Sequence, residues 1–172
     1  MNSLRDPRQH DDLLNYQLKR LLSVGGAPAI RLCEGRYGVS RLQWRLTAAL
    51  VEHGAMSPSE LARRTHVEPG RASRAVTGLV EKRLVHREEH AGDRRRALLS
   101  ATESGKALYA ELFPQLAAIN RRIAAVLDDA EAATLEHCLS KLTEHAQRIY
   151  DEGGGVDARA ERRIGGSRRL WV

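Results

Sequence analysis

The sequence predicts a mainly α-helical protein with one small β-hairpin, and three observations carry this prediction. Apolar residues recur at intervals of three and four over most of the chain, which is the spacing of one helix face. In residues 84–101 the period changes to two on either side of a turn, as in paired strands. No apolar run approaches the roughly 20 residues that a membrane span requires. We therefore expect a soluble, cytoplasmic domain, large enough at 172 residues to bury a core.

A helical segment interrupted by glycine and proline begins the chain. Apolar residues at helical spacing predict a helix over 12–24. Two glycines and Pro28 then predict a break or kink. The helix can resume over 29–34 and end at the glycines that follow, so the first forty residues are expected to be helical in pieces.

Start signals for helices are clear in the middle of the chain. Ser40 predicts the cap of a helix over 41–53, which a glycine stops. Ser57 predicts the cap of a short helix over 58–65 with proline at its first position. Glu60 stands at the place where its side chain completes a capping box with that serine.

A second short helix is predicted over 69–82. Four of its residues share one apolar face, namely Ala72, Val76, Leu79 and Val80. Together with the helix over 58–65 it forms a helix-turn-helix pattern. Its other face carries four polar residues, Arg71, Ser73, Arg74 and Thr77. Because the major groove of DNA is about 12 Å wide and admits a helix, this face predicts contacts with bases and phosphates.

A β-hairpin with an arginine-rich loop is predicted next. Residues 84–89 and 96–101 alternate as strands, and the His-Ala-Gly-Asp sequence at 90–93 is typical of a turn. The loop carries one acidic residue and three arginines, Asp93, Arg94, Arg95 and Arg96. An arginine in a narrow minor groove meets enhanced negative potential, and a neighbouring carboxylate can orient it. We expect Arg94 and Arg95 in the minor groove, with Asp93 as their organiser.

Positive charge is concentrated in the same part of the chain. The formal net charge is +6, and residues 57–100 hold ten basic and six acidic side chains. Residues 101–150 hold five basic and seven acidic ones. This distribution predicts that the middle of the chain contacts a polyanion, with binding that falls steeply as salt is added.

Two long amphipathic helices are predicted after the hairpin. Thr102 caps the first, and Pro114 lies inside it, where we expect a kink. Asp128 and Glu131 form a second capping-box start. Long apolar stripes without an adjacent core suggest packing against another subunit. The tail from Gly153 onward, rich in glycine and arginine, is expected to be disordered.

Several motifs in combination resemble the MarR family of bacterial regulators. They are Gln43-Trp44-Arg45, His53-Gly54, Ser57-Pro58-Ser59-Glu60-Leu61-Ala62, Pro69-Gly70-Arg71-Ala72-Ser73-Arg74, Leu84-Val85 and Asp93-Arg94-Arg95-Arg96. The likeness covers about residues 12–150. It implies a winged helix-turn-helix homodimer that binds a pseudo-palindromic operator, usually to repress. It also implies release of the operator when a small phenolic or aromatic acid binds.

The resemblance also implies an organisation and a set of DNA contacts. The expected segments are 1–39, helical and dimerising; 40–101, the winged helix-turn-helix domain; 102–150, helices completing the dimerisation domain; and 151–172, the tail. The expected DNA contacts are Ser57, Ser59, Pro69, Gly70, Arg71, Ser73, Arg74, Thr77, Asp93, Arg94, Arg95 and Arg96. Arg71 or Arg74 is expected to read guanine, while Ser73 and Thr77 contact phosphate or thymine.

In the family, effectors often bind where the first helices and the long helix meet the DNA-binding part. An aromatic acid needs a cation for its carboxylate and flat apolar walls. Six residues are expected to supply these features, Tyr16, Arg20, Arg31, Trp44, Arg45 and Tyr109. Trp44 and Arg45 are the first choice, and the alternative that they are core and ion-pair residues stays open. The resemblance extends to regulators of aromatic-acid catabolism, with hydroxynicotinate-like compounds among the candidates.

Other functions have weaker support in the sequence. The chain has no P-loop, no G-x-S-x-G, no H-E-x-x-H and no dinucleotide fingerprint, so we expect neither an enzyme nor a cofactor. The histidine and cysteine spacings predict no metal site and no disulfide. Two alternatives remain: a repressor that senses peroxide through Cys33, and a helical interaction module without specific DNA binding.

Overall fold

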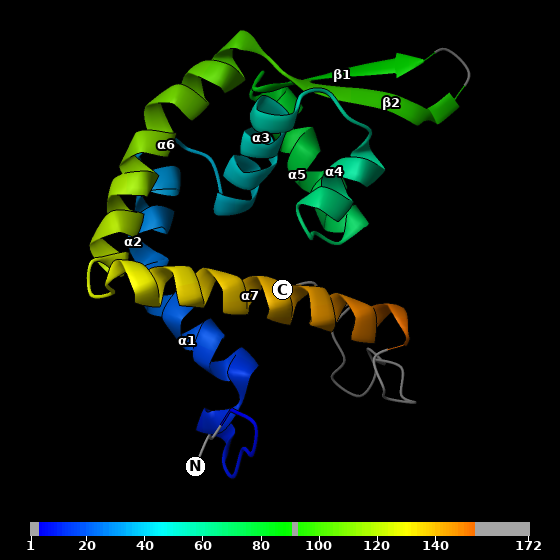
Figure 1. Ribbon diagram of the computed structural model, residues 1–172. Coiled ribbons are helices and arrows are strands. Elements are labelled where there is room, and N and C mark those ends of the chain that lie inside the picture. Colours follow the sequence, from blue (N-terminus) through cyan, green and yellow to red (C-terminus); the bar gives the residue numbers. More distant parts are fainter. Residues whose placement is uncertain (1–3, 91–92, 154–172) are drawn as a thin grey trace. The chain divides into compact units, whose positions relative to one another are not determined.

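The computed structural model describes residues 4–90 and 93–153, with the backbone alone at 89, 90 and 93–96. The described chain is mostly helical and contains one two-stranded antiparallel sheet (Figure 1). The predicted fold class is therefore confirmed. The chain divides within one helix into two compact units, Met1–Ile119 and Asn120–Val172, which are described separately below. The four predicted functional segments stay a prediction, and the predicted disorder beyond residue 153 falls outside the described residues.

The first unit begins with four short helical elements. These are η1 (His10–Asp12), α1 (Leu14–Gly25), α2 (Ala27–Ile30) and η2 (Arg31–Arg36), of which η2 is a π-helix. The break expected near Pro28 is only a junction, because Gly26 keeps a helical backbone and proline fits the first turn of α2. The π-helix was not predicted, and it carries the helical path past Gly35. Gly38, with φ of 62°, then takes the left-handed conformation that favours glycine.

Three capped helices follow, α3 (Arg41–His53), α4 (Pro58–Arg64) and α5 (Pro69–Glu81). Ser40 and Gln43 form a reciprocal capping box, and Gly54 ends α3 with φ of 81°. Ser57 accepts the backbone N–H of Glu60 at 3.2 Å, which confirms the cap of α4. The returning half of that capping box is not formed among the described contacts. The Ser57 hydroxyl instead shares a hydrogen bond with the Ser59 hydroxyl, 3.1 Å away.

The hairpin consists of β1 (Val85–His90) and β2 (Asp93–Ala101), paired antiparallel. It is longer than predicted, since the pairing of His90 with Asp93 carries the ladder to the turn. Arg94 and Arg95 therefore stand in β2 rather than in a loop, which corrects their expected position, while Arg96 lies in the strand as predicted. Strand pairing had not been visible in their sequence because charged residues lack the apolar alternation of a half-buried strand.

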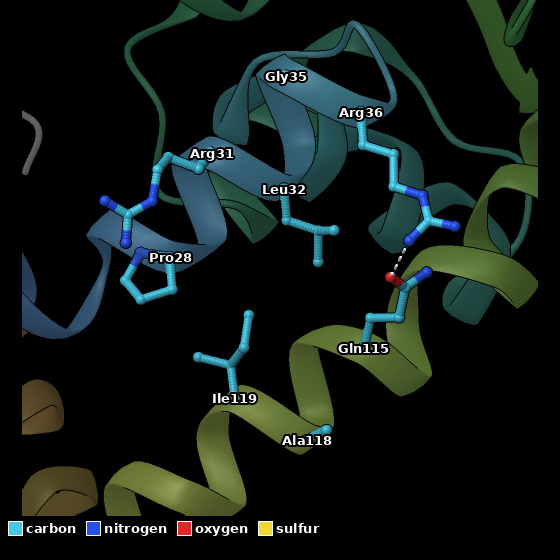
Figure 2. Close-up of a pocket in the computed structure, with 8 residues that line it drawn as sticks. All are labelled: Pro28, Arg31, Leu32, Gly35, Arg36, Gln115, Ala118 and Ile119. Carbon is cyan, nitrogen blue, oxygen red and sulfur yellow. Dashed lines mark hydrogen bonds between the residues drawn. The ribbon is translucent and has the colours of Figure 1, made fainter.

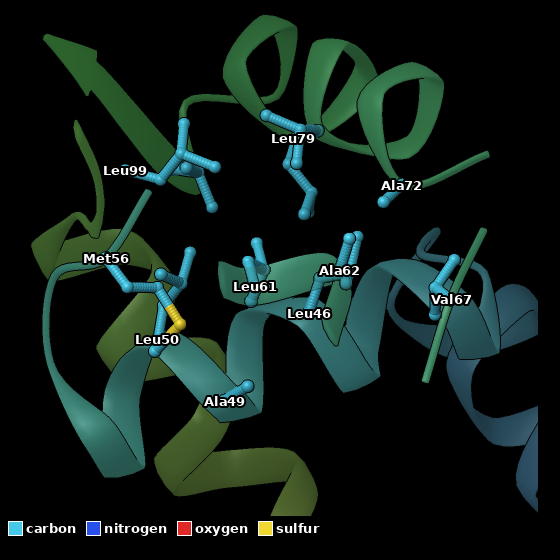
Figure 3. Close-up of a cluster of buried hydrophobic side chains, with 12 residues drawn as sticks. Leu46, Ala49, Leu50, Met56, Leu61, Ala62, Val67, Ala72, Leu79 and Leu99 are labelled. Carbon is cyan, nitrogen blue, oxygen red and sulfur yellow. The ribbon is translucent and has the colours of Figure 1, made fainter. Parts of the chain in front are cut away.

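The main core lies between α3, α4, α5 and the hairpin (Figure 3). Three leucines from different helices, Leu46, Leu61 and Leu79, are fully buried there and meet Leu99 from β2. This packing fixes α5 with its apolar face inward. A second cluster joins Cys33 of η2 to Leu112 of α6 (Glu103–Ala124).

Helix α7 (Asp129–Asp151) makes up most of the described part of the second unit. Asp128 and Glu131 form the predicted capping box at its start. No residue of α7 is buried, although its sequence carries a long apolar stripe. Among the helices of the described ranges, none combines the length and apolar character that would let it cross a membrane.

Candidate nucleic-acid interface

The outer face of α5 carries the residues that the sequence predicts to contact DNA. Arg71, Ser73, Arg74 and Thr77 are all exposed. On the apolar face of the same helix, Ala72, Val76 and Leu79 are buried, whereas Val80, expected on that face, is 37 % exposed. Thr77 donates its hydroxyl to the carbonyl of Ser73 at 3.1 Å, so its oxygen stays available as an acceptor. The predicted division of α5 into a buried and an outward face is thus present in the structure.

Glu68 caps the start of α5, a role that sequence reasoning missed. Its carboxylate accepts the backbone N–H groups of Gly70 at 2.9 Å and Arg71 at 2.8 Å. A helix N-terminus attracts anions because its first N–H groups lack partners within the helix. The Glu68 carboxylate takes the place of such an anion at the N-terminus of α5. Pro69 and Gly70, expected to approach DNA, belong to this carboxylate-capped turn.

A small pocket of about 160 Å³ joins the two helices to the hairpin. Ser59 from α4 and Pro69 and Ser73 from α5 line it, together with Arg87 from β1. Three predicted DNA contacts are therefore neighbours in space. Arg87 is an additional cation at this surface, and its position within a regular strand had given no signal in the sequence.

The predicted minor-groove contacts lie at the far end of the hairpin. Asp93, Arg94, Arg95 and Arg96 belong to β2 by their backbone, and their side chains lie outside what the structure describes. The pairing of β1 with β2 holds this part of the chain beside residues 88–90. The roles expected for these side chains stay predictions.

Arg45 stands close to other arginines and not to a carboxylate partner. Burial lowers its pKa most, and the positive charges of Arg71 and Arg41 lower it further. An arginine remains protonated under all ordinary conditions, so the neighbours repel one another. Arg45 thus adds to the positive potential around the start of α5. The open alternative of an intramolecular ion pair finds no support among the described contacts.

Trp44 and Tyr109, two of the expected effector residues, are stacked together. Their ring centroids are 5.5 Å apart, and Phe113 continues the stack at 5.3 Å from Tyr109. The Tyr109 hydroxyl donates to a carboxylate oxygen of Glu52 at 2.7 Å, which raises the pKa of Tyr109. Each ring of the stack thus already has an aromatic neighbour, and the Glu52 carboxylate places negative charge beside the Tyr109 hydroxyl.

The remaining expected effector residues are placed elsewhere in the first unit. Tyr16 contacts the ring of His10, with centroids 4.3 Å apart, and Arg20 is exposed on α1. Arg31 lines a pocket beside η2 and α6 (Figure 2). The described contacts and pockets therefore do not gather the six residues at one site.

Cys33 is fully buried between η2 and α6. Desolvation raises the pKa of its thiol, so the thiol rather than the reactive thiolate is favoured. Cys138, on α7, is exposed. The geometry does not favour the alternative of peroxide sensing through Cys33. The described residues also contain no cluster of histidine, cysteine and carboxylate side chains that could hold a metal ion.

Two capped helices at a tight turn, followed by an antiparallel hairpin, define a winged helix-turn-helix DNA-binding protein. The MarR family profile matches residues 37–96. The HTH-type transcriptional repressor MdtR of Bacillus subtilis (strain 168) is 30 % identical over 112 residues, which are 65 % of this chain and 72 % of MdtR. The chain belongs to the MarR family. It is a DNA-binding transcriptional regulator and not an enzyme.

Two solved structures share the fold. One describes regulation of DNA binding of Bordetella bronchiseptica BpsR by 6-hydroxynicotinic acid; it is 21 % identical with a TM-score of 0.70 and covers 80 % of this chain and 97 % of that one. The other is an E. coli MarR variant complexed with operator DNA, 24 % identical with a TM-score of 0.62, covering 73 % and 93 %. At these identities the likeness concerns the fold alone.

Proposed function

We propose that the protein is a homodimeric repressor that binds a pseudo-palindromic operator and leaves it when a small aromatic acid binds. The outward face of α5 carries this proposal, because it presents Arg71 and Arg74 from a helix that the core holds rigidly. Two exposed arginines on a rigid helix suit bidentate contacts with guanine in the major groove. The expected arginines of β2 would add contacts in the minor groove.

Exposed apolar side chains support the homodimer. On α7, Leu135, Leu139, Leu142 and Ile149 are each between 38 % and 45 % exposed. They follow one another at helical spacing and form a stripe, which costs free energy in water unless another surface covers it. A second copy is the occupant that fits, because a two-fold axis presents two α5 helices to the two halves of a palindrome.

The gel shift of the chain with the DNA upstream of its own gene tests the proposal. We expect specific binding that survives an excess of unrelated duplex and weakens with added salt. Arg71→Ala and Arg74→Ala are each expected to cost about 1 to 3 kcal/mol of binding free energy and to relax specificity. Arg95→Ala is expected to weaken all sequences more uniformly.

Arg148→Ala on α7 is the matched control, since Arg148 is exposed and belongs to neither helix of the helix-turn-helix. Its affinity should equal that of the unmodified chain. Equal binding to every duplex sequence would contradict the proposal. It would favour the alternative of a helical interaction module without specific DNA binding. If Arg71→Ala weakens binding to all sequences uniformly and Arg95→Ala relaxes specificity, the hairpin and not α5 reads the bases.

A further inference from the structure

The pocket of about 160 Å³ between α4, α5 and β1 combines a cation with two hydroxyl groups. Its polar lining comes from Ser59, Ser73 and Arg87, and none of the described residues that line it is acidic. Small-molecule sites usually have a volume of about 300 to 1,000 Å³. Because this pocket is smaller and positively charged, it suits a single compact anionic group rather than an effector with a ring.

Strand β1 directs Arg87 toward the two helices. Successive side chains of a strand point to opposite faces of the sheet. Val85 is buried in the main core, so Arg87, two residues further on, lies on the same inner face, whereas His86 and Glu88 are exposed. Arg87 pairs across the sheet with Leu99, which is fully buried. The core thus fixes the backbone of Arg87, and a long side chain of this type buries its stem and keeps its charged end at the surface.

The two hydroxyl groups are also held in place. Ser73 is exposed on α5, and Ala72 and Val76, which line the same pocket, are both buried. On α4, the hydroxyl oxygens of Ser59 and Ser57 are 3.1 Å apart. Ser57 already accepts a backbone N–H of α4 and can donate its own hydrogen to Ser59. The hydrogen of Ser59 is then available to an anion.

The apolar part of the lining matches the chemistry of a nucleic-acid backbone. Pro58 and Pro69 line the pocket beside its polar groups. One unit of a DNA backbone joins a charged phosphate to the carbon atoms of deoxyribose, whereas a free phosphate ion has no apolar part. Ser73 belongs both to the pocket and to the exposed face of α5 that carries Arg74. An anion in the pocket therefore lies beside the helix face that is expected in the major groove.

Resting on the operator binding proposed above, we propose that this pocket binds one phosphate of the DNA backbone in each half-site. Arg87 donates charge-assisted hydrogen bonds to the phosphate oxygens, and the hydroxyls of Ser59 and Ser73 donate neutral ones. Ser73 is thereby assigned to phosphate rather than to thymine. Such a contact reads no sequence but fixes the register and orientation of a protein on the duplex. Arg87 is therefore a positioning residue that holds α4, α5 and the hairpin to one point of the backbone.

The salt dependence of binding tests the role of Arg87. The gel shift with the DNA upstream of the gene is repeated with Arg87→Met at several salt concentrations. Affinity is expected to fall about tenfold or more, because hydrogen bonds to a charged group are strong. The slope of log affinity against log salt should become shallower by about one unit, as the loss of one phosphate contact requires. Arg87→Lys keeps the charge and is expected to keep the slope.

Arg148→Met on α7 is the matched control, because it removes the same charge from a helix that does not line the pocket. Its affinity and its slope should equal those of the unmodified chain. An equal change in Arg148→Met and Arg87→Met would reduce the effect to net charge and overturn the assignment. Relaxed base specificity in Arg87→Met would overturn it as well, because a phosphate contact reads no base.

Neutral linkages in the DNA locate the contact from the other side. Each operator phosphate is replaced in turn by a methylphosphonate, which has nearly the same shape without the negative charge. One linkage in each half-site is expected to weaken the unmodified chain about tenfold and to have little further effect on Arg87→Met, since both changes remove one interaction. If every neutral linkage weakens both proteins equally, Arg87 contacts no phosphate and the proposal is wrong.

The two serines carry the same test if Arg87→Met does not fold. Ser59→Ala and Ser73→Ala change exposed side chains. Each is expected to lose about two- to tenfold in affinity, as for one neutral hydrogen bond. Both should be less sensitive than the unmodified chain to the linkage that the pocket binds. Undiminished sensitivity in both variants would overturn the site.

Inorganic phosphate separates a backbone site from a site for free anions. In a calorimetric titration at constant ionic strength, we expect it to bind with a dissociation constant above about 1 mM. Tighter binding that Arg87→Met abolishes would define a small-anion site and overturn the proposal. If specific operator binding persists and Arg87→Met leaves affinity and slope unchanged, the pocket assignment fails and the repressor proposal stands. If no duplex is bound specifically, both proposals fail.

Discussion

Cys33 and Cys138 differ in environment, and the difference sets their reactivity. The first is buried with a raised thiol pKa, and the second is exposed. We expect dithiobis(nitrobenzoate), an aromatic disulfide that releases a coloured thiolate on reaction with a thiol, to modify Cys138 quickly in the folded protein. Cys33 should react only after unfolding in denaturant, because its thiolate is disfavoured and unreachable. Rapid modification of both thiols, with loss of operator binding that Cys33→Ser prevents, would restore the redox hypothesis.

Tyr109 gives the first unit a pH dependence. Its pKa is raised by the hydrogen bond to Glu52 foremost, then by desolvation. The stabilisation is fully present below the ordinary tyrosine pKa of about 10 and is lost as pH rises through the higher folded value.

Tyr109→Phe is expected to lower the free energy of unfolding by about 0.5 to 1 kcal/mol at neutral pH, since the hydrogen bond is partly exposed. Urea denaturation at several pH values checks this. The difference between Tyr109→Phe and the unmodified chain should shrink above about pH 10. A difference that stays constant over this range would assign the loss to packing of the ring.

At the scale of single residues, local hydrogen bonding was predictable and tertiary contacts were not. Ser40, Ser57 and Asp128 are short polar residues ahead of helices, and each caps the helix expected. Glu68 was missed because glutamate is not a usual capping residue. Gln115 and Arg36 are far apart in sequence, and only the packing of α6 against η2 brings them together.

Among the elements, the start of α5 carries a negative charge that would repel the phosphates of the proposed operator. Glu68 places its carboxylate against the N-terminus of this helix. Glu68→Gln removes the negative charge and leaves one acceptor oxygen, so one of the two hydrogen bonds from the N–H groups of Gly70 and Arg71 is kept. We expect operator affinity to rise by about two- to tenfold, with a loss of less than about 1 kcal/mol in stability.

The gel shift repeated at several salt concentrations separates the two effects of Glu68→Gln. The gain in affinity should diminish at high salt, because it comes from reduced repulsion of phosphate. Glu81→Gln, at the other end of α5, is the control. Unchanged affinity in Glu68→Gln would show that the N-terminus of α5 stays away from the DNA backbone.

Helix positions could be predicted because apolar periodicity and caps agree with one another along the chain. The strand β2 was predicted too short, because Arg94 and its neighbours join the ladder through backbone pairing rather than through apolar alternation. The π-helix η2 had no signal in the sequence; its residue Cys33 is buried in one cluster with Leu112, a contact that only the folded chain provides. Such tertiary contacts override local preference.

For the whole molecule, the apolar stripe of α7 is the feature to test. Leu139→Glu places a charge in the stripe and is expected to shift the protein toward a monomer, as light scattering after gel filtration measures. Operator binding should weaken at least tenfold, because one copy contacts only one half-site. His137→Glu, on the other side of α7, is the control and should remain dimeric. A monomeric unmodified chain that binds its operator tightly would contradict the proposed assembly.

The π-helical turn over Arg31–Arg36 also has a bearing on how this chain tolerates change in length. Each residue of an α-helix advances the chain by about 100° around its axis. A π-helical turn holds one residue more than an α-helical turn, so deleting one amino acid here would restore ordinary α-helical winding and leave the segments on either side with nearly unchanged directions. A one-residue deletion should therefore be tolerated better in this turn than within α3 or α5, where it would rotate everything before it by about 100° relative to everything after it.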